Sequence, residues 1–404
     1  MLIKPNKALG IILRRVRPLK TVRKALSEVT SYCLAEDVRA DRDQPAADRS
    51  AMDGFAVRSA DLDKCPRILK LAGEVAAGSP ARRPVRKETC MRVLTGANIP
   101  SGADAVVKLE QTAETDGSVL FHKTVQSGAN IRRRGEEARK GTVLLSKGQV
   151  LDAAQIGLAA AAGKAELRVY SRPRVAVLCT GEELRRAGDQ VRSHEVRDSN
   201  GPALCSALRA WGYRQTTHQV VPDDPKKVSA IVKRSVQKHE VVILSGGVSV
   251  GKYDFVPEAL RQVGACVHFH GVAIKPGKPQ LYATLGKDRH IFGLPGNPLS
   301  VMVGFFEFVL PGLRRMSGLE SKLCQPPLRL PLAGQVESRL NLVHFILARL
   351  IWHKEQLSVA PLKSHGSGDL VAAGPADGMI VLPVRAGKVP SGSRVEFRPW
   401  RPLP

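Results

Sequence analysis

The chain has 404 residues, 43% of them hydrophobic, which is enough to bury several cores and to divide into two to four domains. Lys and Arg number 62 against 37 Asp and Glu, and the net charge of +25 favours either a nucleic-acid binder or an enzyme with acidic ligands. Because the basic residues are scattered and only 4% of residues are aromatic, a platform for stacking bases is poorly supplied, and nucleic-acid binding is disfavoured.

Seven cysteines are dispersed without a C-x-x-C pair, which argues against a disulfide framework and a zinc site and suits a reducing cytosol. The longest apolar run, residues 301–313, contains Glu307 and Pro311 and is too short to cross a bilayer. Residues 5–16 are basic, but their apolar positions recur at helical spacing, so they predict a packed helix rather than a targeting peptide. The sequence predicts a cytoplasmic protein with no membrane contact.

Four domains are predicted along the chain. Residues 1–45 and 139–171 read as one mixed domain, interrupted by a β-rich insertion over residues 46–138 with short alternating runs at 89–94, 105–109 and 118–122. Residues 172–320 predict an α/β domain, and residues 325–404 are strand-rich and predict a C-terminal, β-barrel-like domain.

The α/β prediction comes from alternating strands and helices. The segment predicts a strand at 174–178, a helix near 203–211, a strand ending at 220–221, a helix from Pro225 and a buried strand at 241–244. This alternation is typical of a doubly wound, mostly parallel sheet, in which ligands bind beyond the carboxyl ends of the strands. Thr180-Gly-Glu-Glu183 reads as a capping box that would start a helix.

Three glycine-rich turns lie next to these strands. Glycines expose backbone N–H groups and two lysines add positive charge, so the turns are suited to hold an anion such as phosphate or an oxoanion. The turns are Ser245-Gly-Gly-Val-Ser249, Lys275-Pro-Gly-Lys278-Pro279 and Leu294-Pro-Gly-Asn-Pro298-Leu-Ser300.

Two alternatives accompany the anion site. Gly246 to Lys252 matches a nucleotide phosphate loop, but Tyr253 follows where that motif needs Ser or Thr to ligate magnesium, so a nucleoside triphosphatase is disfavoured. Four acids lie near strand ends or helix starts and are either N-caps or, if they converge, oxygen ligands suited to Mg²⁺. These acids are Asp198, Asp223, Asp224 and Asp254.

Taken in order, seven motifs resemble those of the molybdopterin molybdenumtransferase family, which includes bacterial MoeA, the E domain of gephyrin and its plant counterpart. The resemblance runs from about residue 6 to residue 400. The motifs are Ser50-Ala-Met-Asp-Gly54, Leu94-Thr-Gly-Ala97, Asn130-Ile-Arg-Arg-Arg-Gly-Glu136, Thr180-Gly-Glu-Glu-Leu184, Ser245-Gly-Gly-Val-Ser-Val-Gly251, Lys275-Pro-Gly-Lys-Pro279 and Leu294-Pro-Gly-Asn-Pro298.

The resemblance implies an elongated homodimer that inserts molybdenum from molybdate into adenylylated molybdopterin, releasing AMP with the help of a divalent cation, taken as Mg²⁺. It also implies the molybdopterin adenylyltransferase and molybdoenzyme maturation proteins as partners. The catalytic acids and donors carried over are Asp53 and Thr95, reaching the cleft from the partner subunit, with Glu183, Asp223 and Asp254, which would also hold the metal. The substrate-binding residues are Ser245, Gly246, Gly247, Val248, Ser249, Pro295, Asn297 and Pro298, and those for molybdate are Lys275, Lys278, Pro279, Ser300 and Ser367.

The sequence departs from the family pattern at two places. Glu137 replaces an Asp after the arginine run, and apolar residues replace the arginines that usually flank Phe345, so that Arg339 and Arg349 are the candidates to take their role. A second hypothesis is a non-catalytic scaffold, or a degenerate paralogue that binds a related pterin or another oxoanion. Release of AMP that depends on molybdate distinguishes the enzyme from both.

Overall fold

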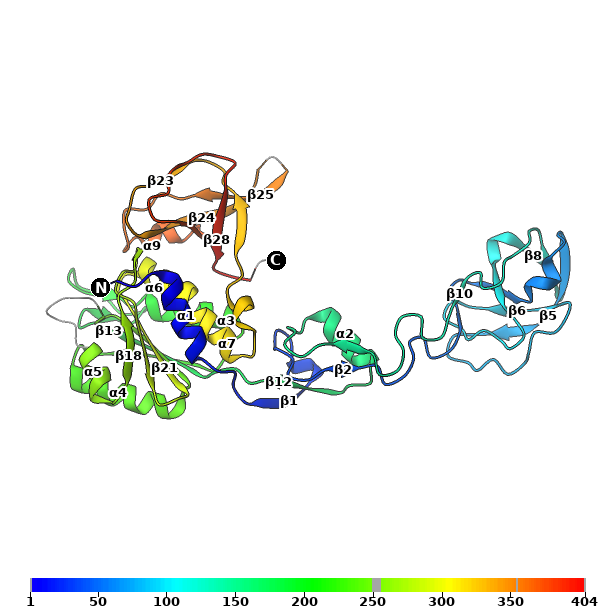
Figure 1. Ribbon diagram of the computed structural model, residues 1–404, viewed down its shortest axis with the longest axis horizontal. Helices are drawn as coiled ribbons and strands as arrows, with labels where there is room; N and C mark the ends of the chain where they lie inside the picture. The colour runs from blue at the N-terminus through cyan, green and yellow to red at the C-terminus, as the bar shows by residue number, and fades with distance from the viewer. Residues whose placement is uncertain (1, 249–255, 354, 403–404) are drawn as a thin grey trace.

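The computed structural model describes residues 2–248, 256–353 and 355–402. Its described part is elongated, with the α/β and C-terminal domains at one end and the β-rich insertion at the other (Figure 1). The motif residues Ser249, Lys252, Tyr253 and Asp254 lie outside the described residues, so the structure says nothing about them.

The α/β domain is built on a six-stranded sheet in the order β16-β13-β17-β21-β20-β18, in which the first four strands are parallel and the last two alternate in direction. The doubly wound α/β prediction is confirmed. The strands are β13 (Val175–Thr180), β16 (Thr216–Val221), β17 (Val241–Ser245), β18 (Cys266–His270), β20 (Leu281–Leu285) and β21 (Arg289–Leu294). The helices are α1 (Pro5–Arg15), α3 (Asn200–Ala210), α4 (Pro225–Lys238), α5 (Val256–Gln262), α6 (Pro298–Gly304), α7 (Leu310–Met316) and α8 (Ser321–Cys324), with a π-helical turn at Phe305–Val309.

Alternating residues of the central strands supply two cores, because successive side chains of a strand point to opposite faces. Val175 and Val177 pack with α1, α3 and α7 on one face, whereas Ala176 and Leu178 pack with α4 and α5 on the other. The predicted helix at residues 5–16 forms as α1, and its Ala8 and Ile12 are buried in the first of these cores. Its packing therefore joins it to the α/β elements; the four domain boundaries stay a prediction.

The remaining domains are mostly β-structure. The insertion carries a sheet in the order β7-β4-β6-β5-β9-β8, and the C-terminal domain a sheet in the order β19-β24-β26-β28-β22 with β25 beside β24. The insertion strands are β4 (Gly54–Val57), β5 (Arg67–Val75), β6 (Thr89–Val93), β7 (Ala105–Lys108), β8 (Thr112–Thr115) and β9 (Ser118–Phe121). The C-terminal elements are β22 (Leu328–Pro331), β23 (Val336–Ser338), β24 (Val343–His353), β25 (Gln356–Pro361), α9 (Leu370–Ala373), β26 (Gly378–Leu382), β27 (Gly387–Val389) and β28 (Arg394–Pro399), and β19 (Ile274–Lys275) joins their sheet.

Short strand pairs and one helix, α2 (Ala153–Ala161), connect the two ends. The paired strands are β1 (Thr21–Ala25) with β12 (Glu166–Tyr170), β2 (Val38–Arg39) with β11 (Val143–Leu145), and β3 (Arg49–Ser50) with β10 (Ile131–Arg132). A further two-stranded pair, β14 (Leu184–Arg185) and β15 (Val196–Arg197), follows β13. Within the described ranges, no helix has both the length and the apolar character that a bilayer crossing requires.

A buried ion pair joins the α/β domain to the C-terminal domain. Glu307 in the π-helical turn is 5% exposed, and its Oε1 accepts from Nε of Arg398 on β28 at 2.6 Å. Replacing Glu307 with Leu leaves a buried guanidinium with one carboxylate fewer, so we expect the free energy of unfolding to fall by about 3 kcal/mol. Thermal unfolding measures this loss. The control is Glu320→Leu, which removes an exposed ion pair with Lys322 and should lower the free energy of unfolding by less than about 1 kcal/mol. Equal shifts in the two variants would contradict the expectation.

Candidate functional site

Four strand ends meet at one edge of the α/β sheet. The parallel strands β13, β16, β17 and β21 end at Thr180, Val221, Ser245 and Leu294, so the turns that follow them lie side by side. A Cβ added to Gly246 would lie 2.3 Å from the Thr180 carbonyl oxygen, and Gly296 approaches Gly246 closely enough that its Cβ would lie 3.8 Å from the Gly246 Cα. The lack of a side chain is therefore required at Gly246, whereas a Cβ at Gly296 would make only an ordinary contact.

The turn after β17 contains two glycines with positive φ angles, and only part of its backbone is free for a ligand. Gly246 and Gly247 have φ values of +98° and +65°, a region that glycine enters without steric cost. The Gly246 N–H donates to the carbonyl of Leu294 at 3.1 Å and is therefore already used within the fold. Any anion held by the backbone of this turn would be held by residues from Gly247 onward.

Asn200, at the start of α3, connects two of the turns. Its Nδ2 donates to Ser245 Oγ at 3.0 Å and to the Gly296 carbonyl at 2.6 Å. Asn200 was not predicted from the sequence, because an Asn at a helix start is typical of capping and nothing in the local pattern indicates that its amide contacts two distant turns.

The acids after β13 and β16 lie in a different local structure from the one predicted. Thr180-Gly-Glu-Glu183 does not start a helix; it ends β13 and leads into the short strand β14, so the capping-box prediction is wrong. Asp223 is partly buried, and one of its carboxylate oxygens has no hydrogen-bond partner among the described residues. Burial first, and then the charges of Glu183 and Glu182, raise the pKa of Asp223, while the Thr180 hydroxyl acts in the opposite direction. Asp224 caps α4 by accepting from the Lys227 N–H at 2.8 Å, as a cap reading predicts.

A cavity of about 300 Å³ lies between the lysine turn and the C-terminal domain. Lys275 on β19 pairs in register with His344 on β24, which places both residues at this cavity. Its polar lining also includes Ser364, His365 and Ser367. Burial and then the charge of Lys275 lower the pKa of His344, so its imidazole is neutral at neutral pH.

The other residues carried over for molybdate lie behind the cavity or beside it. Ser300 is 3% exposed, and its carbonyl accepts from Gln280 Nε2 at 3.2 Å, which ties the lysine turn to α6. Lys278 and Pro279 are in the turn but are not among the residues that line the cavity. Asn297 Nδ2 donates to Ser367 Oγ at 2.9 Å, joining the β21 turn to the C-terminal domain.

The arginine candidates do not reach this cavity. Arg339 is highly exposed and its Nε donates to Glu337 Oε1 at 2.6 Å, whereas Arg349 is exposed and lies opposite Ala360 of β25. Neither arginine is among the described residues that line the cavity. Its lining contains two histidines, His344 and His365. The sequence motifs assign neither histidine a role.

Asp53 and Thr95 lie together but apart from the other site residues. Asp53 Oδ1 accepts from the Thr95 backbone N–H at 2.6 Å and from the Thr95 hydroxyl at 2.8 Å. These hydrogen bonds lower the pKa of Asp53, so the exposed carboxyl is ionised at neutral pH. The pair belongs to the insertion domain, at the end of the molecule opposite the α/β domain (Figure 1). Within one chain, the structure does not bring it to the strand-end turns.

Comparison with known proteins accounts for nearly the whole chain. Family models match residues 3–163 (MoeA N-terminal region, domains I and II), 176–315 (probable molybdopterin binding domain) and 329–400 (MoeA C-terminal region, domain IV). The molybdopterin molybdenumtransferase of Staphylococcus aureus strain Mu50 is 34% identical over 396 residues, covering 97% of this chain and 94% of that protein. That of Staphylococcus epidermidis strain RP62A is 33% identical over 386 residues, covering 94% and 91%.

Solved structures agree with the sequence relatives. A molybdopterin biosynthesis MoeA protein from Pyrococcus horikoshii OT3 superposes with a TM-score of 0.84 at 26% identity, covering 99% of this chain and 100% of that one. A second structure described as molybdopterin biosynthesis MoeA protein, from Pyrococcus horikosii, gives a TM-score of 0.80 at 27% identity with full coverage of both chains. The family resemblance that the seven motifs indicated is confirmed: the chain belongs to the molybdopterin molybdenumtransferase (MoeA) family.

Proposed function

We propose that this protein inserts molybdenum from molybdate into adenylylated molybdopterin, producing molybdenum cofactor and AMP. The observation that carries the proposal is the convergence of the strand-end turns beside a cavity lined by Lys275, His344 and Ser367, in a chain of this family. Such an arrangement would serve as a phosphate cradle next to an oxoanion pocket, and binding both reactants there would bring the dithiolene sulfurs close to the metal oxoanion.

The phosphate of the substrate would lie over the β17 and β21 turns. Gly247 and Val248 offer backbone at the strand end, and Pro295, Asn297 and Pro298 form the neighbouring wall. Asn200 fixes the two turns relative to each other, so they are preorganised before substrate binds. The Ser245 hydroxyl accepts from Asn200 Nδ2 and donates to the Pro295 carbonyl, so Ser245 is a positioning residue.

Molybdate would enter the cavity of about 300 Å³. Lys275 supplies a positive point charge, and the hydroxyls of Ser364 and Ser367 and the imidazoles supply hydrogen-bonding groups for its oxygens. His344 and His365 stand in for the family's arginines as polar groups, but the neutral His344 does not replace their charge.

The residues beyond β13 and β16 fit a magnesium ion. Asp223 presents a buried carboxylate oxygen without a partner among the described residues, and Glu183 is close enough to perturb it. These are hard oxygen donors of the kind that Mg²⁺ binds, and Asp254 is the further ligand proposed from the family motif. A bound Mg²⁺ would neutralise phosphate charge during cleavage of the phosphoanhydride.

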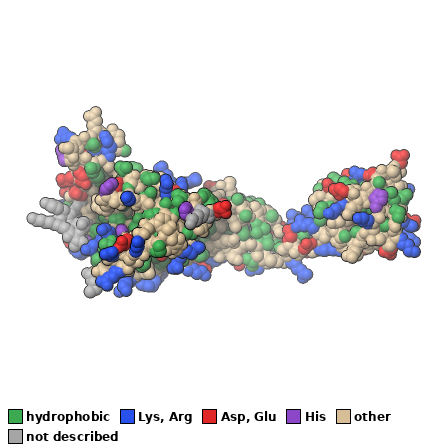
Figure 2. Space-filling model, turned by 90° about the horizontal axis from the view of Figure 1, so that it is seen from above, with side chains coloured by type: hydrophobic (Ala, Val, Ile, Leu, Met, Phe, Trp, Pro, Cys, Tyr) green, Lys and Arg blue, Asp and Glu red, His purple; other side chains and the backbone are tan. Residues whose placement is uncertain are grey.

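The assembly and setting of the protein are also proposals. Since Asp53 and Thr95 lie far from the turns of their own chain, a complete site requires the insertion domain of a second subunit, as in a homodimer. Lys and Arg side chains are spread along the face shown in Figure 2 rather than gathered into one stripe, which supports a small anionic substrate over nucleic acid. We propose that the enzyme acts in the cytoplasm, with the molybdopterin adenylyltransferase and molybdoenzyme maturation proteins as partners.

The activity test is release of AMP. Purified protein with Mg²⁺, molybdate and adenylylated molybdopterin should release AMP, and leaving out molybdate should reduce the release to background. If AMP stays at background with molybdate present, the enzyme proposal fails and a scaffold or a paralogue with another oxoanion takes its place. Substituting tungstate or sulfate then shows whether release depends on the particular oxoanion.

Asn200→Ala removes both hydrogen bonds that hold the two turns together. Each such bond contributes about 1 kcal/mol, so we expect KM for adenylylated molybdopterin to rise by up to roughly 30-fold. Steady-state AMP release measures this, and Gln237→Ala on the exposed side of α4 serves as the control that should leave KM unchanged. An unchanged KM in Asn200→Ala would show that the turns keep their positions without the amide.

A further inference from the structure

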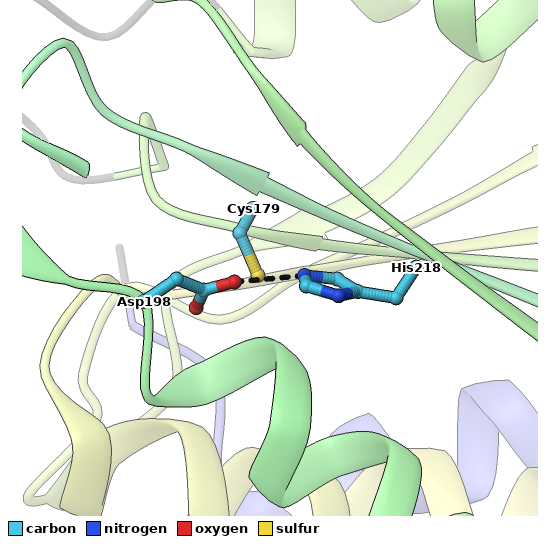
Figure 3. A group of neighbouring side chains, drawn as sticks. All are labelled: Cys179, Asp198 and His218. Atoms are coloured by element: carbon cyan, nitrogen blue, oxygen red, sulfur yellow. Dashed lines mark hydrogen bonds and ion pairs between the residues drawn. The ribbon is translucent and has the colours of Figure 1, made fainter. Parts of the chain in front are cut away.

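Cys179, Asp198 and His218 converge next to the phosphate turns, and their side chains point toward one another (Figure 3). Cys179 is on β13 and His218 on β16, where His218 pairs in parallel register with Val177. Because side chains alternate along a strand, Cys179 lies on the same face as Val177 and therefore on the same face as His218. Asp198 comes just before α3, which packs on that face.

The three potential ligand atoms are a sulfur, a carboxylate oxygen and an imidazole nitrogen, and they all lie within 4.8 Å of one another. His218 Nε2 is 2.7 Å from Asp198 Oδ2. Gly201 makes this approach possible, since a Cβ there would lie 2.0 Å from His218 Nε2. Any other residue at position 201 would push the imidazole away from the carboxylate.

The carboxylate is oriented from behind. The Gly201 N–H donates to Asp198 Oδ1 at 2.9 Å, leaving Oδ2 directed at the histidine. Outer contacts of this kind hold a ligand carboxylate in place around metals in proteins. Cys179 and Asp198 are 1% and 5% exposed, whereas the His218 side chain is 30% exposed and opens a path from solvent.

We propose that Cys179, Asp198 and His218 form a binding site for Zn²⁺ or a similar borderline transition-metal ion. Thiolate, imidazole and carboxylate are the ligand types of tetrahedral zinc sites, and water at the exposed histidine edge completes four ligands. On binding, the ion displaces the thiol proton to solvent, so that the thiolate and the carboxylate together balance its two positive charges. This balance suits a place where two of the three ligands are buried.

The site is separate from the proposed magnesium and molybdate sites. A bound metal ion would connect Asp198, just before α3, to β13 and β16. Because Asp198 lies two residues before Asn200, this connection would stabilise the position of the Asn200 amide that links the phosphate turns. Its function is structural, and metal binding can be measured without turnover. Failure of the metal proposal and failure of the proposed enzyme activity are therefore distinguishable.

The experiment is titration of metal-stripped, full-length protein with Co²⁺ in excess Mg²⁺, which occupies the proposed magnesium site, followed by absorption spectroscopy. We expect one Co²⁺ per chain, with the visible bands of four-coordinate cobalt and a near-ultraviolet thiolate-to-cobalt band, and displacement by Zn²⁺. Cys179→Ser should remove the thiolate band. Loss of a residue that only supports a metal ligand weakens binding by roughly 10- to 100-fold, so His218→Gln, which removes a ligand, should weaken Co²⁺ binding at least as much. His218 lies on the edge strand β16 and is partly exposed, so we expect this substitution to disturb folding little.

Cys266→Ser provides the matched control. Cys266 is exposed and its sulfur lies 3.8 Å from His268 Nδ1, which makes this pair another Cys–His neighbour in the described chain. The variant should keep the full cobalt spectrum and stoichiometry. Loss of the thiolate band in Cys266→Ser, wild-type affinity in His218→Gln, or the lack of saturable one-to-one binding would each overturn the proposal and leave the trio as hydrogen-bonded neighbours only.

Discussion

Replacing Lys275 and Lys278 together with Ala should slow molybdate-dependent AMP release by at least about 100-fold, the scale of losing one preorganised electrostatic group. Lys275 lines the oxoanion cavity, and His344 beside it is held neutral by burial and by that lysine's own charge. Arg339 and Arg349 lie outside the cavity lining. The lysine turn is therefore the main positive charge available to a molybdate dianion among the lining residues described here.

The comparison of single and double variants separates two roles. Only Lys275 is among the lining residues, so Lys275→Ala should raise KM for molybdate more than Lys278→Ala does. Both side chains are exposed, so thermal unfolding should shift little. The control is Lys233→Ala with Lys238→Ala on the exposed side of α4, which removes the same charge far from the turns. Wild-type turnover in the Lys275 and Lys278 double variant would remove both residues from the site.

The sequence predicted the α/β domain well because its elements carry strong periodic signals. Buried runs such as 241–244 and the helix from Pro225 show apolar residues at the spacings typical of a strand and a helix. Thr180 to Glu183 was misread because the cap pattern is local. Thr180 is buried as the last residue of β13, and that tertiary burial overrides the helix-start signal.

The contacts that complete the site could not be predicted, because they depend on segments far apart in the chain. Asn200 is 45 residues from Ser245 and 96 residues from Gly296, yet one amide contacts both. The seven dispersed cysteines argued against zinc because they contain no C-x-x-C pair. Positions 179, 198 and 218 are also too far apart in the chain to match a zinc motif. Parallel pairing of β13 with β16 brings Cys179 and His218 together, and this contact depends on which strands become neighbours in the sheet.

The second large effect is expected from Asp53 in the insertion domain, which we propose completes the site of the partner subunit. Asp53→Ala should reduce turnover by at least about 100-fold if its ionised carboxylate, held by two Thr95 hydrogen bonds, completes the partner's site. Because Asp53 is exposed and contacts no core, the loss of its Thr95 hydrogen bonds should lower the free energy of unfolding by no more than about 2 kcal/mol. A large loss of activity in a variant that stays folded at the assay temperature then marks a role in the site.

Mixed dimers decide whether that role is exercised in the same subunit or in the partner. Two differently tagged chains, one with Asp53→Ala and one with the combined Lys275→Ala and Lys278→Ala substitution, are co-expressed and purified through both tags. If sites form between subunits, one site of each mixed dimer combines all three substitutions and the other has none, so about half of the wild-type rate should return from two inactive variants.

The control dimer combines Asp53→Ala with a chain carrying all three substitutions. Each of its two sites then lacks at least one group, and it should stay inactive. If instead Asp53 served the turns of its own chain, every site in the first mixed dimer would contain at least one substitution and no activity would return. Recovery in the first dimer alone would therefore establish that the insertion domain, distant from the turns of its own chain in Figure 1, acts on those of its partner.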